Sequence, residues 1–458
     1  MSNHRRFNAT AVLVAVVAAA TLVAAALLAP PAAASEYPSA PGDLLWMQTW
    51  HPRSDFMKYG LIDVVRGPGG DLWLGIGGST SSGDSPYEKR ICVARYSANG
   101  VKRWTRVLPS PVSMTFYYGI AVDRRGNAIV VGQRLDYDVT TGYPWVITKL
   151  SPSGKRLWTK VRPSPAYSDH AKPSGVAVDS RGDIYVSGTM TRTTTGDDVV
   201  LTKYASTGAL KWTRYIDGYE GSNDTGVDVA VDPKDRVFVL GTMGSFFAGS
   251  DITFAQYTSG GKQVGKRTWD GDSHDDVATD LAVTPYNVVI AGSADGADGR
   301  ARGVILLCAA NINDYLIPET ITSVPGSDLT WTSVAKGTDG PIAAGGTVTG
   351  VGPSEFAYAT WPGSMEASAT FYPSPAGSAT CDDIAMMADG TAVGVGTFYD
   401  AGYAGDLHVM SDPQTGSGWR TTVGLPSRED GRSLVVTNSG VYVTGECGQQ
   451  IGLWKFQP

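Results

Sequence analysis

The chain has 458 residues with 37 basic and 44 acidic side chains, so its formal net charge is −7 at pH 7. This mild acidity excludes the basic stripe of a nucleic-acid-binding protein and suits solubility or a cationic ligand. Four cysteines in a chain of this size exclude a scaffold held together by disulfides. The 56 glycines, with no long amphipathic helical pattern, favour β structure with many turns.

Residues 1–34 have the pattern of an export signal. Arg5 and Arg6 precede an apolar stretch over 10–28, and alanines at 32–34 supply a small-residue cleavage site. We expect cleavage before Ser35, which would remove two arginines and no acidic residue. The apolar stretch is long enough that an uncleaved anchor is the alternative. No later segment could span a membrane, so the remaining chain is expected to be secreted or held at the cell surface.

One pattern recurs through residues 35–458, which we therefore expect to form a single domain. Its clearest copies are GIAVDRRGNAIVVG at 119–132, GVAVDSRGDIYVSG at 175–188 and DVAVDPKDRVFVLG at 228–241. Repeats start near residues 61, 119, 175, 228, 280, 333, 383 and 433. A period of roughly 50 residues indicates a propeller or a solenoid, with one supersecondary unit per repeat.

Each repeat contains four predicted strands, as at 175–178, 184–188, 199–204 and 209–215. Four antiparallel strands in each radial unit describe the blade of a β-propeller. The last repeat offers three strands, at 434–437, 441–444 and 451–456, whereas residues 44–50 resemble the missing fourth. The sequence therefore predicts an all-β fold, a single eight-bladed β-propeller in which the N-terminal strand completes the last blade. Seven blades is the alternative, because the fifth and sixth repeats are degenerate.

The repeats GVAVDSRGDIYVSG and GIAVDRRGNAIVVG resemble the bacterial β-propeller repeat called SBBP and are also similar to the NHL repeat. The SBBP likeness includes the later segment at 145–160, WVITKLSPSGKRLWTK. That segment also resembles the tryptophan-docking motif of quinoprotein-like propellers. The clear likeness covers about residues 60–270 and implies a propeller from a bacterium. It implies no activity, because SBBP is the name of a structural repeat.

Two recurring residue types are best explained by the architecture. Asp179 begins a short turn, and aspartates at turn starts accept hydrogen bonds from backbone N–H groups further along. Tryptophans recur once per repeat in the fourth strand, where a large aromatic ring packs between blades; the alternative is a stacking platform for a sugar or quinone. These tryptophans are Trp104, Trp158, Trp212, Trp269 and Trp419.

The long, varied loops fall on one face, which is where function is expected. Aspartates come shortly before the first strands there, so they either form a carboxylate ring at the channel mouth or cap turns. The candidate ligand-binding residues are Asp169, His170, Asp224, Asp275, Asp382, Tyr117 and Tyr143. Further aromatic candidates are Phe116, Tyr118, Phe246 and Phe247.

One acidic run is a candidate metal site. Its carboxylates belong to Asp270, Asp272, Asp275 and Asp276. Ca²⁺ prefers several carboxylate oxygens from a flexible loop, although the run lacks the glycine and the closing glutamate of an EF-hand. The alternative is that these aspartates cap turns.

The cysteines allow one disulfide. Cys381 precedes the first strand of the seventh repeat and Cys447 follows the second strand of the eighth, so both are predicted at the long-loop end of neighbouring blades. A bridge between them is possible in an oxidising compartment. Cys92 and Cys308 are predicted to be buried thiols.

No metalloprotease, serine-hydrolase or P-loop motif is present. We therefore expect a secreted, non-catalytic, monomeric binding or scaffold protein with no cofactor beyond possible Ca²⁺. Its partner would be an extracellular protein, glycan or cell-wall component. The alternative is a lyase or hydrolase with carboxylates at the channel mouth. A catalyst would bring His170 or His274 together with carboxylates and a basic residue.

Overall fold

The computed structural model describes most of the chain after residue 39. The described residues are 40–52, 56–82, 85–109, 114–135, 143–164, 171–218, 221–245, 249–271, 274–313, 316–337, 341–350, 352–361, 368–373, 377–399, 405–411, 418–424 and 428–458. The predicted export signal lies outside them. Within these ranges no helix is long and apolar enough to cross a membrane.

Successive groups of four antiparallel strands form the first four blades. Blade 1 contains β2 (Phe56–Arg66), β3 (Leu72–Ser82), β4 (Ser85–Tyr96) and β5 (Lys102–Val107), with the short 3-10 helix η1 (Pro68–Gly70) between β2 and β3. Blade 2 contains β6 (Met114–Val122), β7 (Ala128–Leu135), β8 (Trp145–Leu150) and β9 (Arg156–Arg162). Blade 3 contains β10 (Pro173–Val178), β11 (Ile184–Arg192), β12 (Gly196–Tyr204) and β13 (Leu210–Ile216). Blade 4 contains β14 (Thr225–Val231), β15 (Val237–Gly244), β16 (Ser250–Tyr257) and β17 (Gln263–Trp269).

The remaining strands form four more blades. Blade 5 contains β18 (Asp276–Val283), β19 (Asn287–Asp295), β20 (Ala301–Ala309) and β21 (Leu316–Thr322). Blade 6 contains β22 (Ser327–Lys336), β23 (Ile342–Gly350), β24 (Glu355–Trp361) and β25 (Ser368–Pro373). Blade 7 contains β26 (Ala379–Met386), β27 (Ala392–Tyr399), β28 (Gly405–Ser411) and β29 (Arg420–Val423). Blade 8 contains β30 (Glu429–Thr437), β31 (Gly440–Cys447), β32 (Gln450–Phe456) and β1 (Leu44–Trp50).

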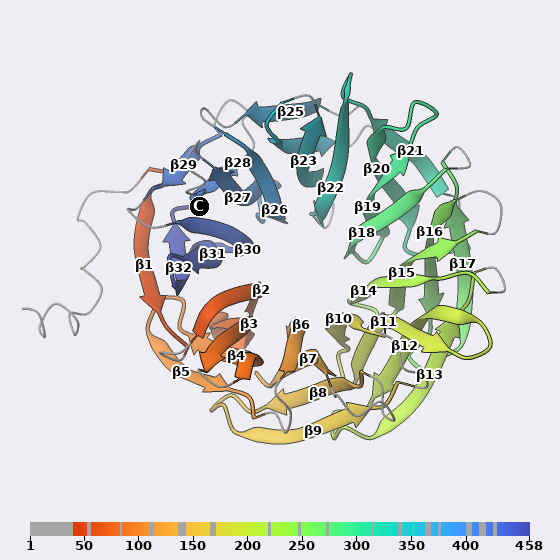
Figure 1. Cartoon of the computed structure of the whole chain (residues 1–458), viewed down its shortest axis with the longest axis horizontal. Coiled ribbons are helices and arrows are strands. Elements are labelled where there is room, and N and C mark those ends of the chain that lie inside the picture. The colour runs from red at the N-terminus through yellow and green to blue at the C-terminus, as the bar shows by residue number, and fades with distance from the viewer. Residues whose placement is uncertain are drawn as a thin grey trace, which may run out of the picture. The chain divides into compact units, whose positions relative to one another are not determined.

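The eight blades of the domain formed by residues 41–458 stand around a central axis, with the first strand of each blade innermost (Figure 1). This arrangement confirms the predicted eight-bladed propeller over the seven-bladed alternative. All eight predicted repeat starts lie within innermost strands. The degenerate fifth and sixth repeats form four-stranded blades like the others.

The first and last strands of the propeller close the ring. β1 pairs antiparallel with β32, and Met47 lies opposite Trp454 while Trp50 lies opposite Ile451. As predicted from the missing strand of the last repeat, residues 44–50 therefore supply the outer strand of blade 8 (Figure 1). The backbone hydrogen bonds that β1 forms cover an edge of β32 that would otherwise be open.

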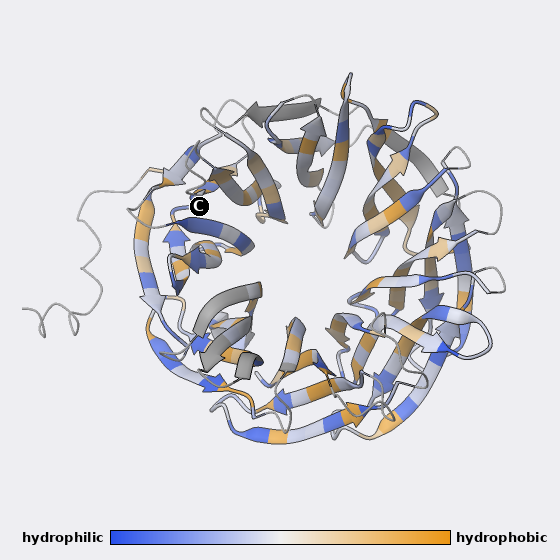
Figure 2. Cartoon of the chain, viewed as in Figure 1, coloured by the Kyte–Doolittle hydropathy of each residue, from blue (hydrophilic) through white to orange (hydrophobic). Residues whose placement is uncertain are grey.

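The core lies between neighbouring blades. Each cluster of buried apolar side chains combines strands of two blades, as Leu240 and Phe254 of blade 4 pack with Ile290 and Leu306 of blade 5. Hydrophobic residues are concentrated in the middle strands, whereas the outermost strands alternate with polar residues (Figure 2).

The recurring tryptophans pack between blades, as predicted. Trp104 on the outer strand of blade 1 donates its indole N–H to the carbonyl oxygen of Pro152 in blade 2, at 2.9 Å. Its ring lies against Gly154, whose φ is +78° and where an added Cβ would lie 2.8 Å from the ring. Trp158 and Trp212 donate in the same way to Ser206 and Ser259 of the next blades.

Asp179 is part of the turn, and it also joins blades. Its Oδ1 accepts hydrogen bonds from the backbone N–H groups of Arg181 and Asp183, as the sequence predicted. Its Oδ2 lies 3.3 Å from the buried Nζ of Lys203, which also donates to the carbonyl oxygen of Ser259 in the next blade. The ion pair with Lys203 was not predicted.

No disulfide joins Cys381 and Cys447, the pair between which the sequence allowed a bridge, because all four cysteines carry free, buried thiols. Cys381 packs in the apolar cluster between blades 6 and 7. Cys447 packs in the cluster between blades 7 and 8. Blade 7 therefore separates the two sulfur atoms. Cys92 and Cys308 are buried thiols, as predicted.

The closure by β1 can be tested by truncation. A chain that begins at residue 52 should lose more than about 3 kcal/mol of unfolding free energy, because β1 contributes the buried Trp50 and the half-buried Trp46. It should also aggregate through the uncovered edge of β32. Thermal unfolding and size-exclusion chromatography, with a chain beginning at Ser35 as the control, measure both effects. Equal stability of the two chains would contradict this role for β1.

Candidate functional site

A β-bulge interrupts the innermost strand pair of every blade. At each bulge one or two extra residues lie between the paired positions, as Asp382 does between Cys381 and Asp383. The extra residues around the ring are Gly60 and Leu61, then Tyr118, Ser174, Val227, Thr279, Thr332, Asp382 and Arg432. A bulge bends the strand and changes the direction of its side chains. These residues consequently line the central channel.

The channel contains two overlapping cavities of about 650 and 460 Å³. Residues from the bulges of all eight blades line one or both of them. Both cavities share Asp63, Thr279, Asp280, Asp383 and Ser433. The channel is therefore a continuous polar cavity built by the innermost strands.

The principal charged groups of the channel wall are the half-buried carboxyls of Asp63, Asp228, Asp280 and Asp383. The hydroxyl oxygen of Ser333 lies within hydrogen-bond distance of both Asp280 and Asp383, at 3.0 Å from each. Each of these two carboxyls also accepts a hydrogen bond from a backbone N–H of the next blade: Asp280 from Val334, and Asp383 from Leu434. These carboxyls thus link blades 5 to 8 around the channel.

Partial burial raises the pKa of every one of these carboxyls, because removing water disfavours the charged form. The pKa of Asp63 rises to about 6 and that of Asp383 to about 7. The pKa of Asp228 rises to about 8, by burial first and then by repulsion from Asp280. Arg432 is the only basic side chain among the described residues that line the channel cavities. Part of this wall is therefore protonated near neutral pH.

Asp382 lies in the channel wall, but an arginine neutralises it. The guanidinium of Arg432 lies 3.4 Å from Asp382 and 3.1 Å from Asp430. The guanidinium of Arg428 also pairs with Asp430, at 2.7 Å. Asp328, near the start of the first strand of blade 6, pairs with Arg300. Among the described residues, Asp328, Asp382 and Asp430 are therefore paired with arginines and do not form a free carboxylate ring, which was one of the two arrangements the sequence allowed.

A third cavity, of about 380 Å³, opens between blades 1 and 2. Its wall includes Phe116, Tyr118 and Lys89, and three glycines contribute bare backbone. The ammonium of Lys89 lies 4.3 Å from the ring centre of Phe116. Tyr118, Gly60 and Leu61 also line the channel cavities, so the side cavity adjoins the channel.

The aromatic candidates have different surroundings. Tyr117 is only 3% exposed and donates its hydroxyl to Asp63, so it packs beneath the side cavity. Tyr118 is half-buried and donates to Gln133 at 3.2 Å, which fixes its ring beside the channel. Tyr143 is also half-buried. Phe246 and Phe247 lie outside the described residues.

The acidic candidates are divided among several surroundings. Asp169, His170 and Asp272 lie outside the described residues. Asp275 accepts hydrogen bonds from the backbone N–H and hydroxyl of Ser250. Of the predicted metal set, Asp270 and Asp276 do come together, and the third member of their cluster is Asp251, which the sequence analysis missed.

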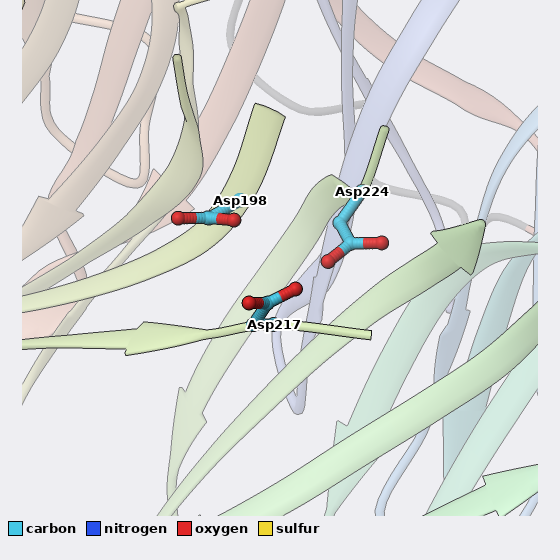
Figure 3. Close-up of side chains that lie close together, drawn as sticks. All are labelled: Asp198, Asp217 and Asp224. Atoms are coloured by element: carbon cyan, nitrogen blue, oxygen red, sulfur yellow. The ribbon is translucent and has the colours of Figure 1, made fainter. Parts of the chain in front are cut away.

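Asp224 is a member of a second acidic cluster. It lies with Asp198 and Asp217, which come from the preceding blade (Figure 3). Neither partner was predicted. Burial raises the pKa of Asp224 to about 6, and that of Asp276 in the other cluster to about 7.

The histidines that the structure describes do not meet the channel carboxyls. His408 is buried and stacks on Phe398 with ring centres 4.0 Å apart, and burial lowers its pKa to about 3. His51 lies beside Gln450 in the outer part of blade 8. None of the described histidines lines the channel or the side cavity.

Comparison with known proteins assigns no activity to this chain. No family model and no curated protein matches the sequence. Among solved structures, the chain is similar to the WD40 domain of SCAP from fission yeast, at 8% identity and a TM-score of 0.49 over 90% of this chain and 98% of that one. It is also similar to the polysaccharide lyase Uly1, at 10% identity and a TM-score of 0.46 over 90% of this chain and 99% of that one. Likenesses this distant carry no functional argument, and SBBP or NHL membership stays a prediction.

The raised pKa of Asp228 predicts a pH-dependent effect on stability. Folding gives this carboxyl a higher pKa than in the unfolded chain, so the folded state binds more protons between about pH 4 and 8. Its contribution to stability therefore falls as pH rises through that range. The melting temperature of Asp228→Asn minus that of the unmodified protein should therefore become more positive as pH is raised from 5 to 9. Asp298→Asn, at an exposed carboxyl, is the control; an Asp228→Asn difference that does not vary with pH would contradict the prediction.

Proposed function

We propose that the protein is a secreted, non-catalytic binding protein that holds a segment of a glycan at the channel and its side cavity. The observation that carries this proposal is the junction of two unlike surfaces. Aromatic rings and bare glycine backbone line the side cavity, and carboxyls with serine and threonine hydroxyls line the adjoining channel.

This combination suits a sugar ring. The apolar face of a sugar can pack against Phe116 and Tyr118, because aromatic rings offer large, rigid apolar contact surfaces. Sugar hydroxyls can donate to Asp63 and Asp383 and accept from Lys89 or from a protonated carboxyl. A few polar groups convergent on an apolar pocket are typical of small-molecule sites.

Catalysis by a lyase or hydrolase is the less favoured function. Such chemistry needs an acid and a base positioned on the same substrate. The described channel offers carboxyls with raised pKa and Arg432, which is engaged by Asp382 and Asp430. No described histidine completes a catalytic group there.

Glycan binding can be measured with the chain that begins at Ser35. We expect cell-wall polysaccharide fractions to bind it, and Phe116→Ala and Tyr118→Ala each to weaken binding about tenfold through lost ring contact. Tyr286→Ala is the matched control, because this tyrosine is 59% exposed in the turn between β18 and β19. Glycan arrays followed by titration calorimetry give the affinities.

Other outcomes would contradict the proposal. Binding to no glycan, or equal losses in the control and the two cavity variants, would reject the site. Capture of a protein but no glycan would reject the ligand class. Cleavage of a bound polysaccharide that Asp383→Asn abolishes would replace the binding function with catalysis.

Secretion has its own test. The full chain expressed in a bacterial host should appear outside the cytoplasm with a new N-terminus at Ser35, since the small-residue site ends at Ala34. Mass spectrometry of the exported protein measures this. An unprocessed chain that stays in the membrane fraction would instead support the uncleaved anchor.

A further inference from the structure

Two consecutive blade junctions repeat the same arrangement of three aspartates. At the first junction Asp198 lies on β12, Asp217 follows β13 and Asp224 precedes β14 of the next blade. At the second, Asp251 on β16, Asp270 after β17 and Asp276 at the start of β18 occupy the corresponding places. The strand register is the same at both junctions. Asp198 lies two residues before the β12 residue that pairs with Gly188, and Asp251 lies two residues before the β16 residue that pairs with Gly241.

The carboxylates of each group converge. Within each junction, one oxygen from every member lies within 4.8 Å of the others. Figure 3 shows the side chains of Asp198, Asp217 and Asp224 directed toward one another from three separate chain segments. Like charges at this separation repel strongly: the pKa of Asp198 is raised by burial first and then by repulsion from Asp217.

Buried oxygen atoms in each group have no hydrogen-bond partner. Asp198 and Asp276 are both 0% exposed, and the Oδ1 atom of each is unpartnered. The Oδ1 atoms of Asp217 and Asp251 are also buried and unpartnered. An unsatisfied, buried carboxylate oxygen is costly. A feature this costly, repeated at two junctions, points to a ligand that supplies positive charge.

The other oxygens of these groups are held by the surrounding structure. Asp198 Oδ2 accepts from Thr195 at 2.8 Å and faces Arg192 at 3.2 Å. Asp224 accepts from the backbone N–H groups of Gly218 and Gly244. At the second junction the N–H of Gly271 donates to Asp276 Oδ2. These bonds fix the carboxylates before any ligand arrives.

We propose that each of these two junctions binds one Ca²⁺ ion through its three aspartates. Hard divalent cations take carboxylate oxygens, and Ca²⁺–O distances of about 2.3–2.6 Å allow ligand oxygens up to roughly 5 Å apart. Ca²⁺ is favoured over Mg²⁺ because it accepts irregular geometry with six to eight ligands. Water can complete the coordination, since Asp217 is half-buried and Asp270 is exposed. The ion would tie the outer strand of one blade to the inner strand of the next.

Blade 7 provides a natural comparison. At its junction with blade 8, the strand register places Asp406 where Asp198 and Asp251 stand at the two proposed sites. It places Glu429 where Asp224 and Asp276 stand. Gly424 stands where Asp217 and Asp270 stand at the two proposed sites, directly after the outer strand. This junction lacks the second carboxylate, so we expect no ion there. Asp406→Asn is therefore a matched control.

Calorimetry of the chelator-treated chain beginning at Ser35 tests the proposal. Two Ca²⁺ ions should bind per chain, with dissociation constants of about 10⁻⁴–10⁻³ M, the range of extracellular modules. Ca²⁺ at ten times that constant should raise the melting temperature by about 3 °C. Asp217→Asn and Asp270→Asn should each leave one site, the double variant none, and Asp406→Asn both. The same titration with Mg²⁺ should show weaker binding.

Melting in a chelator separates ion binding from a structural role. Without Ca²⁺, Asp217→Asn and Asp270→Asn should melt at or above the temperature of the unmodified protein, because repulsion is removed; with Ca²⁺ they should melt below it. Lower melting under both conditions, no bound Ca²⁺ in the unmodified protein, or two sites retained in the single variants would overturn the proposal. Each of these outcomes is independent of glycan binding.

Discussion

The pairing of β1 with β32 is the contact on which the rest of the molecule depends. Each blade buries its two faces against its neighbours, so a ring with a loose last blade would expose one face of blade 1 and one of blade 7. The antiparallel ladder from Leu44 to Trp50 connects the two ends of the propeller through backbone hydrogen bonds. The tryptophan, lysine and aspartate contacts between blades then repeat around a ring whose circumference is already fixed. The channel and the blade junctions are consequences of that closure.

The β-bulges of the innermost strands supply the side chains of the candidate site. In a regular strand, side chains alternate between two faces, and both faces of an inner strand lie against neighbouring blades. The extra residue at each bulge breaks the alternation and directs side chains such as Tyr118, Asp382 and Arg432 into the channel. Because every blade has this bulge, the channel lining can differ from blade to blade while the packing between blades stays the same.

The repeat could be predicted from the sequence because its copies are evenly spaced and share turn residues. The closing strand could be predicted because the last repeat has only three strands. Most of the channel lining was not readable, although the candidates Asp382 and Tyr118 do line it. Asp63, Asp280 and Asp383 were recognised only as markers of repeat starts, since a bulge leaves no fixed signature in a single sequence. The metal prediction found Asp270 and Asp276, which are close in the chain, and missed Asp251, which reaches them only through the pairing of β16 with β17. Local acidic runs show carboxylates, whereas ligand sets depend on register.

The acidic excess of this chain is balanced in different ways at different places. Arginines neutralise Asp382 and Asp430 at one side of the channel. Protons are held by carboxyls such as Asp228 and Asp383, whose pKa values rise to about 8 and about 7. At the two junctions beside blade 4, raised pKa values let Asp224 and Asp276 hold protons part of the time, yet the Oδ1 atoms of Asp198 and Asp276 stay unpartnered. The proposed divalent cation would balance the three carboxylates there, and its binding would stiffen the blades that hold Asp228 and Asp280 in the channel wall.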